Sequence, residues 1–186
     1  PPIMRPNTAL KESNIAEYLL YIYQIEAMMR SFNLDLDLIK NQLLIPGSTS
    51  PEQLLDHQQW YESLIAEFQR RGLQKEGHIE EVEEVLMELV YLHNTLLTIV
   101  NDEKYKVLCE QAQPDLLEFK KRSNMSQRQD IEALLHAMFM KLQLKMKQQE
   151  ISPETEAAFD LFRIQLAYLS RAYSQMKSGA LNFFQN

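Results

Sequence analysis

The 186-residue sequence has little cysteine, glycine or valine, and each shortage narrows the possible folds. Its only cysteine, Cys109, cannot form a disulfide within the chain. A lone cysteine is typical of a reducing compartment, so we expect a cytoplasmic protein. There are only four glycines, and leucine far outnumbers the β-branched valine. This composition favours helix over sheet and predicts an all-α fold.

The chain also has fewer basic than acidic residues. The chain carries 19 Lys and Arg against 26 Asp and Glu, which gives a net charge of −7. Phosphate backbones and anionic lipids repel an acidic chain, so we expect no nucleic acid and no membrane as partners. The longest uncharged and mostly apolar run, 89–100, is too short to cross a bilayer, which takes about 20 residues.

Segments with helical spacing of apolar residues fill most of the chain, and glycine and proline mostly fall between them. The predicted helices cover about 13–32, 50–72, 78–100, 102–119, 127–149 and from 152 onward, with a short turn or helix at 35–44. Short loops between long helices predict a single-domain antiparallel bundle of about six helices. Ser13, Ser50 and Asp102 are the expected N-caps, and Pro114 is expected to kink or split its helix.

The bundle is expected to span residues 13–178. Residues 1–12 are expected to be a disordered or non-native N-terminal segment, and 179–186 a C-terminal tail.

The motifs of common catalytic and metal sites are missing from this sequence. It contains no Glu-x-x-His, His-Glu-x-x-His or Cys-x-x-Cys motif and no glycine-rich phosphate loop. We therefore expect no catalytic residue, no metal and no cofactor. Cys109 lies on the apolar side of its helix, which favours a structural thiol over a nucleophile.

The first long helix is apolar almost all round, which predicts that it is the most buried helix. It nevertheless carries Glu17, Tyr21 and Gln24 on one face. One interpretation is a polar ligand pocket at these three residues, to which His93 could contribute. The alternative is that this face reaches solvent or pairs with a cation, and that His93 is a core histidine bonded to a backbone or tyrosine group.

A buried Glu17 would need a hydrogen-bond or cationic partner, because an unpaired buried carboxylate is costly. The candidate partners lie on the third and sixth long helices and are His93, Arg163 and Arg171.

Two further features have alternative interpretations. Trp60 and Tyr61 are adjacent, so they point in different directions, and one is expected in the core and the other at an interface. Arg71 and His78 form a loose Arg-x6-His pattern that resembles an element of helical HEPN ribonucleases, although two glycines interrupt it. The acidic balance of the chain argues against an RNA substrate.

Several stretches together resemble a known family. They are residues 14–21, 24–26, 34–37, 60–61, 77–78, 92–93 and 150–155, and the block in the first helix is the most specific of them. The chain resembles a family of uncharacterised bacterial helical proteins of about this length, known only as a domain of unknown function. Tyr23 stands where the resemblance leads us to expect Trp. The resemblance implies a soluble, intracellular, all-helical protein, and it assigns no activity or ligand.

The leading functional hypothesis is a non-catalytic interaction or assembly module that forms a homo-oligomer, most simply a dimer. Wide apolar helix faces and nine methionines suit adaptable interfaces. The alternatives are a small-ligand-binding bundle with a pocket at the first helix and, more remotely, a HEPN-like ribonuclease.

Overall fold

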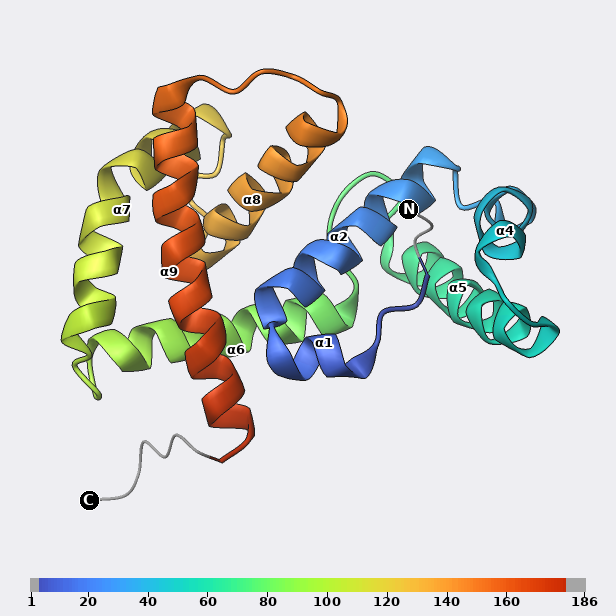
Figure 1. The fold of residues 1–186 in the computed structure, drawn as a ribbon, viewed down its shortest axis with the longest axis horizontal. Coiled ribbons are helices and arrows are strands. Elements are labelled where there is room, and N and C mark those ends of the chain that lie inside the picture. Colours follow the sequence, from blue (N-terminus) through green and yellow to red (C-terminus); the bar gives the residue numbers. More distant parts are fainter. Residues whose placement is uncertain (1–3, 180–186) are drawn as a thin grey trace. The chain divides into compact units, whose positions relative to one another are not determined.

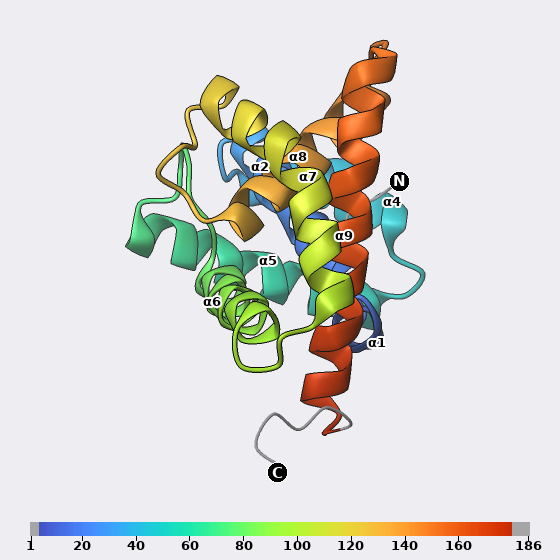
Figure 2. The ribbon, with the colours of Figure 1, turned by 90° about the vertical axis from the view of Figure 1, so that its left-hand side faces the viewer.

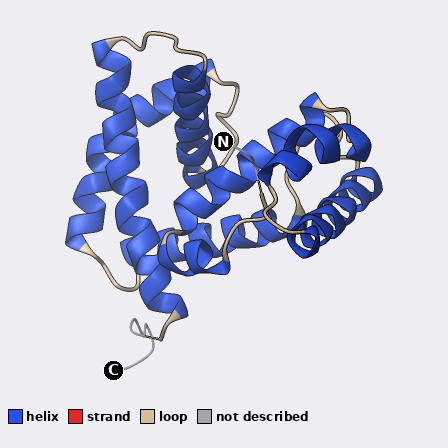
Figure 3. Cartoon of the chain, turned by 45° about the vertical axis from the view of Figure 1, so that its right-hand side comes forward, coloured by secondary structure: helices blue, strands red, loops and turns tan. Residues whose placement is uncertain are grey.

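The structure, a computed structural model, describes residues 4–179. Within these residues every regular element is a helix, and Figure 3 shows no strand among them. The all-α prediction is therefore confirmed. Most of the expected C-terminal tail, 180–186, lies outside the described residues.

The helices follow the predicted segments closely (Figure 1). They are α1 (Thr8–Ser13), α2 (Ile15–Ser31), α3 (Leu36–Ile39), the π-helix η1 (Lys40–Leu44), α4 (Ile45–Gly47), α5 (Pro51–Arg71), α6 (Glu80–Leu97), α7 (Glu103–Arg122), α8 (Asp130–Met146) and α9 (Pro153–Lys177). The short helix α1 begins inside the segment 1–12, which was expected from the sequence to be disordered or non-native.

The described chain divides into two compact units. Unit 1 comprises residues 4–8 and 21–83 of the described chain, and unit 2 comprises 9–20 and 84–179. Helices α2 and α6 therefore contribute residues to both units. Both helices continue through the boundary between the units without a glycine or proline.

Side-chain caps fix where most of the long helices begin. Ser50 accepts a hydrogen bond from the backbone N–H of Gln53, and Asp102 accepts one from that of Tyr105, as predicted. The predicted cap Ser13 is wrong, because it still belongs to α1. The neighbouring Asn14 takes the role instead, and its Oδ1 lies 3.2 Å from the backbone N of Glu17.

Pro114 does not split its helix. The helix α7 runs without interruption from Glu103 to Arg122, with Pro114 on its exposed side. Proline removes one backbone donor and leaves the carbonyl four residues earlier without its partner. That carbonyl belongs to Glu110, which is exposed, so water can satisfy it.

Unit 2 is built around α7, α8 and α9, each of which packs against the other two. Figure 2 shows α7 and α9 side by side along much of their length. Their shared core includes Leu116 from α7, Leu134 from α8 and Phe162 from α9, all almost fully buried. Burying a side chain of this size stabilises the fold by about 1.5–3 kcal/mol.

In unit 1, α5 packs against α3 and η1. Its inner face buries Tyr61, Leu64 and Phe68, and Gly72 ends it in the left-handed conformation with φ of 68°. Over the described residues, none of the helices has both the length and the apolar character that a membrane span requires.

Candidate functional site

Unit 2 contains a polar cavity of about 310 Å³. It is lined by His93 and Asn94 of α6, Lys120 in the last turn of α7, the loop residues 126–129, and Asp130 and Ile131 at the start of α8. The loop exists because α7 ends at Arg122 and the chain turns at Asn124, whose φ is 55°. Asparagine is among the few residues that tolerate this left-handed conformation.

His93 is held in the wall of this cavity by a buried tyrosine. Its Nδ1 lies 2.6 Å from the hydroxyl of Tyr105, and the two rings pack edge to face with centroids 5.5 Å apart. Burial lowers the pKa of His93, and the nearby carboxylate of Asp130 opposes this only in part. His93 is therefore neutral at pH 7, with one ring nitrogen able to donate and the other to accept.

Behind His93 the hydrogen-bond network continues into the core. The hydroxyl of Tyr105 also bonds to Gln165 and Cys109, and burial raises the pKa of Tyr105 so that it stays protonated. Burial raises the pKa of Cys109 to about 11, which leaves its thiol protonated and unsuited to nucleophilic attack. The amide oxygen of the buried Gln165 has no hydrogen-bond partner within the described part of the chain.

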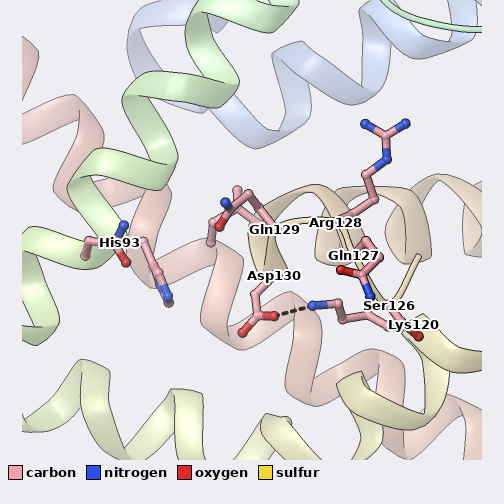
Figure 4. A pocket seen from close by; sticks show the side chains of 9 residues that line it. His93, Lys120, Ser126, Gln127, Arg128, Gln129 and Asp130 are labelled. Carbon is pink, nitrogen blue, oxygen red and sulfur yellow. Dashed lines mark hydrogen bonds and ion pairs between the residues drawn. The ribbon is translucent and has the colours of Figure 1, made fainter.

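An ion pair between the end of α7 and the start of α8 forms part of the cavity wall. Lys120 is buried, and its Nζ lies 2.9 Å from Oδ1 of Asp130. Figure 4 shows this pair together with His93 among the lining residues, and it shows Arg128 extending away from the pair. A buried lysine needs such a partner because desolvation of an isolated charge is costly. The pair fixes the end of α7 to the beginning of α8.

The lining combines charged, amide and imidazole groups. The charges of Lys120 and Asp130 cancel, Arg128 adds a positive charge, and His93 is neutral. The amides of Asn94 and Gln127 both donate and accept hydrogen bonds. The cavity wall holds no activated nucleophile. Across residues 4–179, no group of three or more His, Cys, Asp or Glu side chains could hold a metal ion.

The predicted pocket residues have different environments. Glu17 is exposed, which agrees with the alternative interpretation that its face reaches solvent and contradicts a buried, paired carboxylate at this position. Tyr21 is half-buried, and its hydroxyl donates to the carbonyl oxygen of Met4 at 2.7 Å. Gln24 is also half-buried. Glu17 and His93 belong to unit 2, and Tyr21 and Gln24 to unit 1.

Arg163 and Arg171, the arginines suggested as partners of Glu17, both lie at the surface of α9. Arg163 pairs with Asp160 at 3.6 Å on the surface of α9. Arg171 is exposed. The tyrosine partner suggested for His93 is correct.

The buried carboxylate of α2 is Glu26 rather than Glu17. Glu26 is 1% exposed, and its two oxygens lie 2.8 Å from Nδ1 of His78 and 2.8 Å from the backbone N of Ile79. Tyr23 stacks on the His78 ring with centroids 4.2 Å apart. This network lies within unit 1 and attaches the start of α6 to α2. Sequence spacing alone could not say which glutamate of this mostly apolar helix faces the core.

Two arginine side chains hold the loop 72–79, which follows α5. Arg30 donates to the carbonyl oxygens of Leu73 and Gly77 at 3.0 and 2.6 Å. Arg71 donates to the carbonyl oxygen of His78 at 3.1 Å. The loop 72–79 is therefore fixed by side chains from both α2 and α5.

This geometry contradicts the ribonuclease interpretation of Arg71 and His78. The guanidinium of Arg71 pairs with Glu67 at 3.1 Å and Glu83 at 3.3 Å, and the imidazole of His78 faces Glu26. The two side chains lie among carboxylates, whereas an RNA-cleaving site needs a positively charged cleft.

Trp60 and Tyr61 pack edge to face, with ring centroids 5.2 Å apart. Tyr61 is fully buried, which confirms that one of the pair belongs to the core and excludes it from an exposed interface. Trp60 is half-buried, and its interface role stays a prediction.

Comparisons with known proteins give a family but no activity. No curated protein and no solved structure matches the chain. A match to the family described as "Domain of unknown function (DUF4924)" extends over residues 4–180, nearly the whole chain. This agrees with the resemblance seen in the sequence, and the chain belongs to the DUF4924 family.

Proposed function

We propose that this protein is a non-catalytic binding protein, and that the cavity of unit 2 holds a small polar molecule. The observation that carries the proposal is the polar wall around His93, Lys120 and Asp130, in which each of these side chains is held by a defined partner. Groups fixed in this way can bind a ligand without first losing conformational freedom. The cavity volume of about 310 Å³ lies at the lower end for small-molecule sites.

The lining favours an uncharged or zwitterionic ligand. Lys120 and Asp130 together contribute no net charge, and His93 is neutral at pH 7. Arg128 adds a cation that can bind the carboxylate of a zwitterion. Asn94, Ser126 and Gln127 add donors and acceptors in similar numbers. Amino acids and small sugars have this balance of hydrogen-bonding groups, so they are the ligand class that we expect.

The proposal can be tested by filling the cavity. Ser126 is exposed at the cavity wall, so Ser126→Trp should occupy the space without disturbing the core. Lys121→Trp is the matched control, because Lys121 is exposed on α7 and does not line the cavity. Wild type and both variants would be titrated with a panel of amino acids and monosaccharides.

Binding would be followed by the NMR shifts of the His93 ring and by thermal melting. We expect at least one member of the panel to shift the His93 signals and raise the melting temperature in wild type and in Lys121→Trp, but not in Ser126→Trp. A ligand held at 100 times its dissociation constant adds about 2.7 kcal/mol to the free energy of unfolding. Binding that survives unchanged in Ser126→Trp would contradict this assignment of the site.

We also infer a cytoplasmic location. Cys109 is the only cysteine of the chain, so no disulfide can form within it. Burial also raises the pKa of Cys109 and keeps its thiol protonated. Both features suit a reducing compartment.

A further inference from the structure

One cation in the cavity of unit 2 has no partner in the described part of the chain. Arg128 lines the cavity and is exposed, and its guanidinium forms neither a hydrogen bond nor an ion pair with any residue between 4 and 179. Arg71, Arg122 and Arg163, by contrast, each pair with a carboxylate. Figure 4 shows the Arg128 side chain extending away from the ion pair in the cavity wall. A guanidinium with free donors is suited to bind a carboxylate through two parallel hydrogen bonds.

The same wall carries a carboxylate with one unused oxygen. Oδ1 of Asp130 accepts a hydrogen bond from Lys120 at 2.9 Å, and Oδ2 has no partner among the described residues. The Asp130 side chain is 28% exposed, so a ligand in the cavity can reach this oxygen. An ionised carboxylate accepts hydrogen bonds, and an ammonium group donates them. Arg128 and Asp130 are only two residues apart, so a ligand with a carboxylate and an ammonium group on one carbon complements both side chains.

The rest of the lining favours a polar, uncharged group on the ligand. Asn94, Gln127 and Gln129 contribute amides, and Ser126 contributes a hydroxyl. Each of these groups both donates and accepts hydrogen bonds. Among the described residues that line the cavity, Ile131 is the one apolar side chain. An apolar ligand group would therefore displace water from the amides without replacing its hydrogen bonds.

We infer that the ligand of this cavity is a free α-amino acid with an uncharged polar side chain, such as glutamine, asparagine or serine. Arg128 donates to its carboxylate, Oδ2 of Asp130 accepts from its ammonium group, and the amide of Gln127 bonds its side chain. The inference rests on the proposed function and narrows it, because a sugar has no charged group for Arg128 and Asp130 to bind. Arg128 is then the residue that determines the preference for a carboxylate.

The first experiment varies the ligand and leaves the protein unchanged. The full chain would be titrated calorimetrically with glutamine, asparagine, serine, leucine and glucose, and then with the methyl ester and the N-acetyl derivative of the tightest binder. We expect one of the three polar amino acids to bind most tightly. The ester and the N-acetyl derivative should each bind about tenfold more weakly, because each loses a hydrogen bond between charged groups.

The second experiment removes the cation. Arg128 is exposed, so Arg128→Gln should keep the fold, which circular dichroism checks. The variant should bind the amino acid about tenfold more weakly and the methyl ester as the wild type does, because the ester has no carboxylate. The matched control is Arg122→Gln, which removes an exposed cation that pairs with Glu118 and does not line the cavity. It should leave both affinities unchanged.

The outcomes separate this inference from the proposed function. A wild type that binds glucose but none of the amino acids would overturn the inference and leave the proposed function intact. A wild type that binds neither would count against both. The inference is also wrong if the methyl ester binds as tightly as the amino acid, or if Arg128→Gln and Arg122→Gln have the same effect on binding.

Discussion

The two units each contain a buried polar network, and the networks differ in how fully their groups are satisfied. In unit 1, both oxygens of Glu26 have partners at 2.8 Å, and Arg30 and Arg71 bond the carbonyls of the neighbouring loop. In unit 2, the network around His93 borders a cavity, and the amide oxygen of Gln165 has no partner among the described residues. A fully satisfied network rigidifies a fold. In unit 2, the polar groups that border the cavity are the ones that a ligand could reach.

The Glu26 network and the His93 network therefore have different roles, the first structural and the second proposed for binding. Glu26 and His93 both lie on mostly apolar helices, so the sequence alone does not tell the two networks apart. Only the partners distinguish them. Glu26 bonds the backbone at the start of α6, which is a structural role, and His93 faces a space large enough for a ligand.

The largest expected effect is the loss of the Glu26 carboxylate. Glu26→Ala should lower the free energy of unfolding by about 3 kcal/mol, because the Ile79 N–H and the His78 ring lose their partner and a space opens in the core. The control is Glu17→Ala on the same helix, which should stay within about 0.5 kcal/mol because Glu17 is exposed. Urea melts of the two variants give both values, and equal losses would contradict the role assigned to Glu26.

A smaller effect is expected when the ion pair of unit 2 loses its cation. Lys120→Met keeps the length of the side chain and leaves Asp130 without its partner. We expect a loss of about 2 kcal/mol, less than for a fully buried pair, because the Asp130 side chain is 28% exposed.

Arg122→Met provides the comparison for Lys120→Met. It breaks the exposed pair with Glu118 near the same end of α7 and should change stability by less than about 0.5 kcal/mol. If the two substitutions cost the same, the Lys120–Asp130 pair is no stronger than a surface pair.

The smallest expected effect is a pH dependence from His93. Burial lowers the pKa of His93 in the folded state, so the unfolded chain binds the proton more readily. The contribution of His93 to stability is complete above the ordinary histidine pKa of about 6.5 and is lost as the pH falls below it. One proton limits the slope to about 1.4 kcal/mol per pH unit.

His93→Gln removes this titration while keeping a polar side chain. Urea melts from about pH 5 to about pH 8 cover the range on both sides of the ordinary histidine pKa of about 6.5. Stability should depend less on pH in the variant than in wild type. Identical profiles would mean that the protonation of His93 does not couple to folding.

The sequence by itself determined the helices and most of their ends. Leucine-rich periodic segments and capping residues such as Ser50 and Asp102 act through neighbours only a few positions away, so their effects can be predicted locally. The same local logic identified the tyrosine or backbone partner as one of the two alternatives for His93. It also flagged the first long helix as rich in buried residues, which Ile15, Leu19, Ile22 and Ile25 confirm.

Only the tertiary structure decided which polar residues meet. Glu17 and Glu26 lie on the same helix, and the sequence does not tell their environments apart. Glu17 is exposed, whereas Glu26 is 1% exposed because loop 72–79 closes over it. The cavity near His93 likewise requires the end of α7 and the start of α8, which lie far from His93 along the chain. Such contacts depend on how helices pack against one another, and packing combines many weak interactions between distant segments that no local pattern encodes.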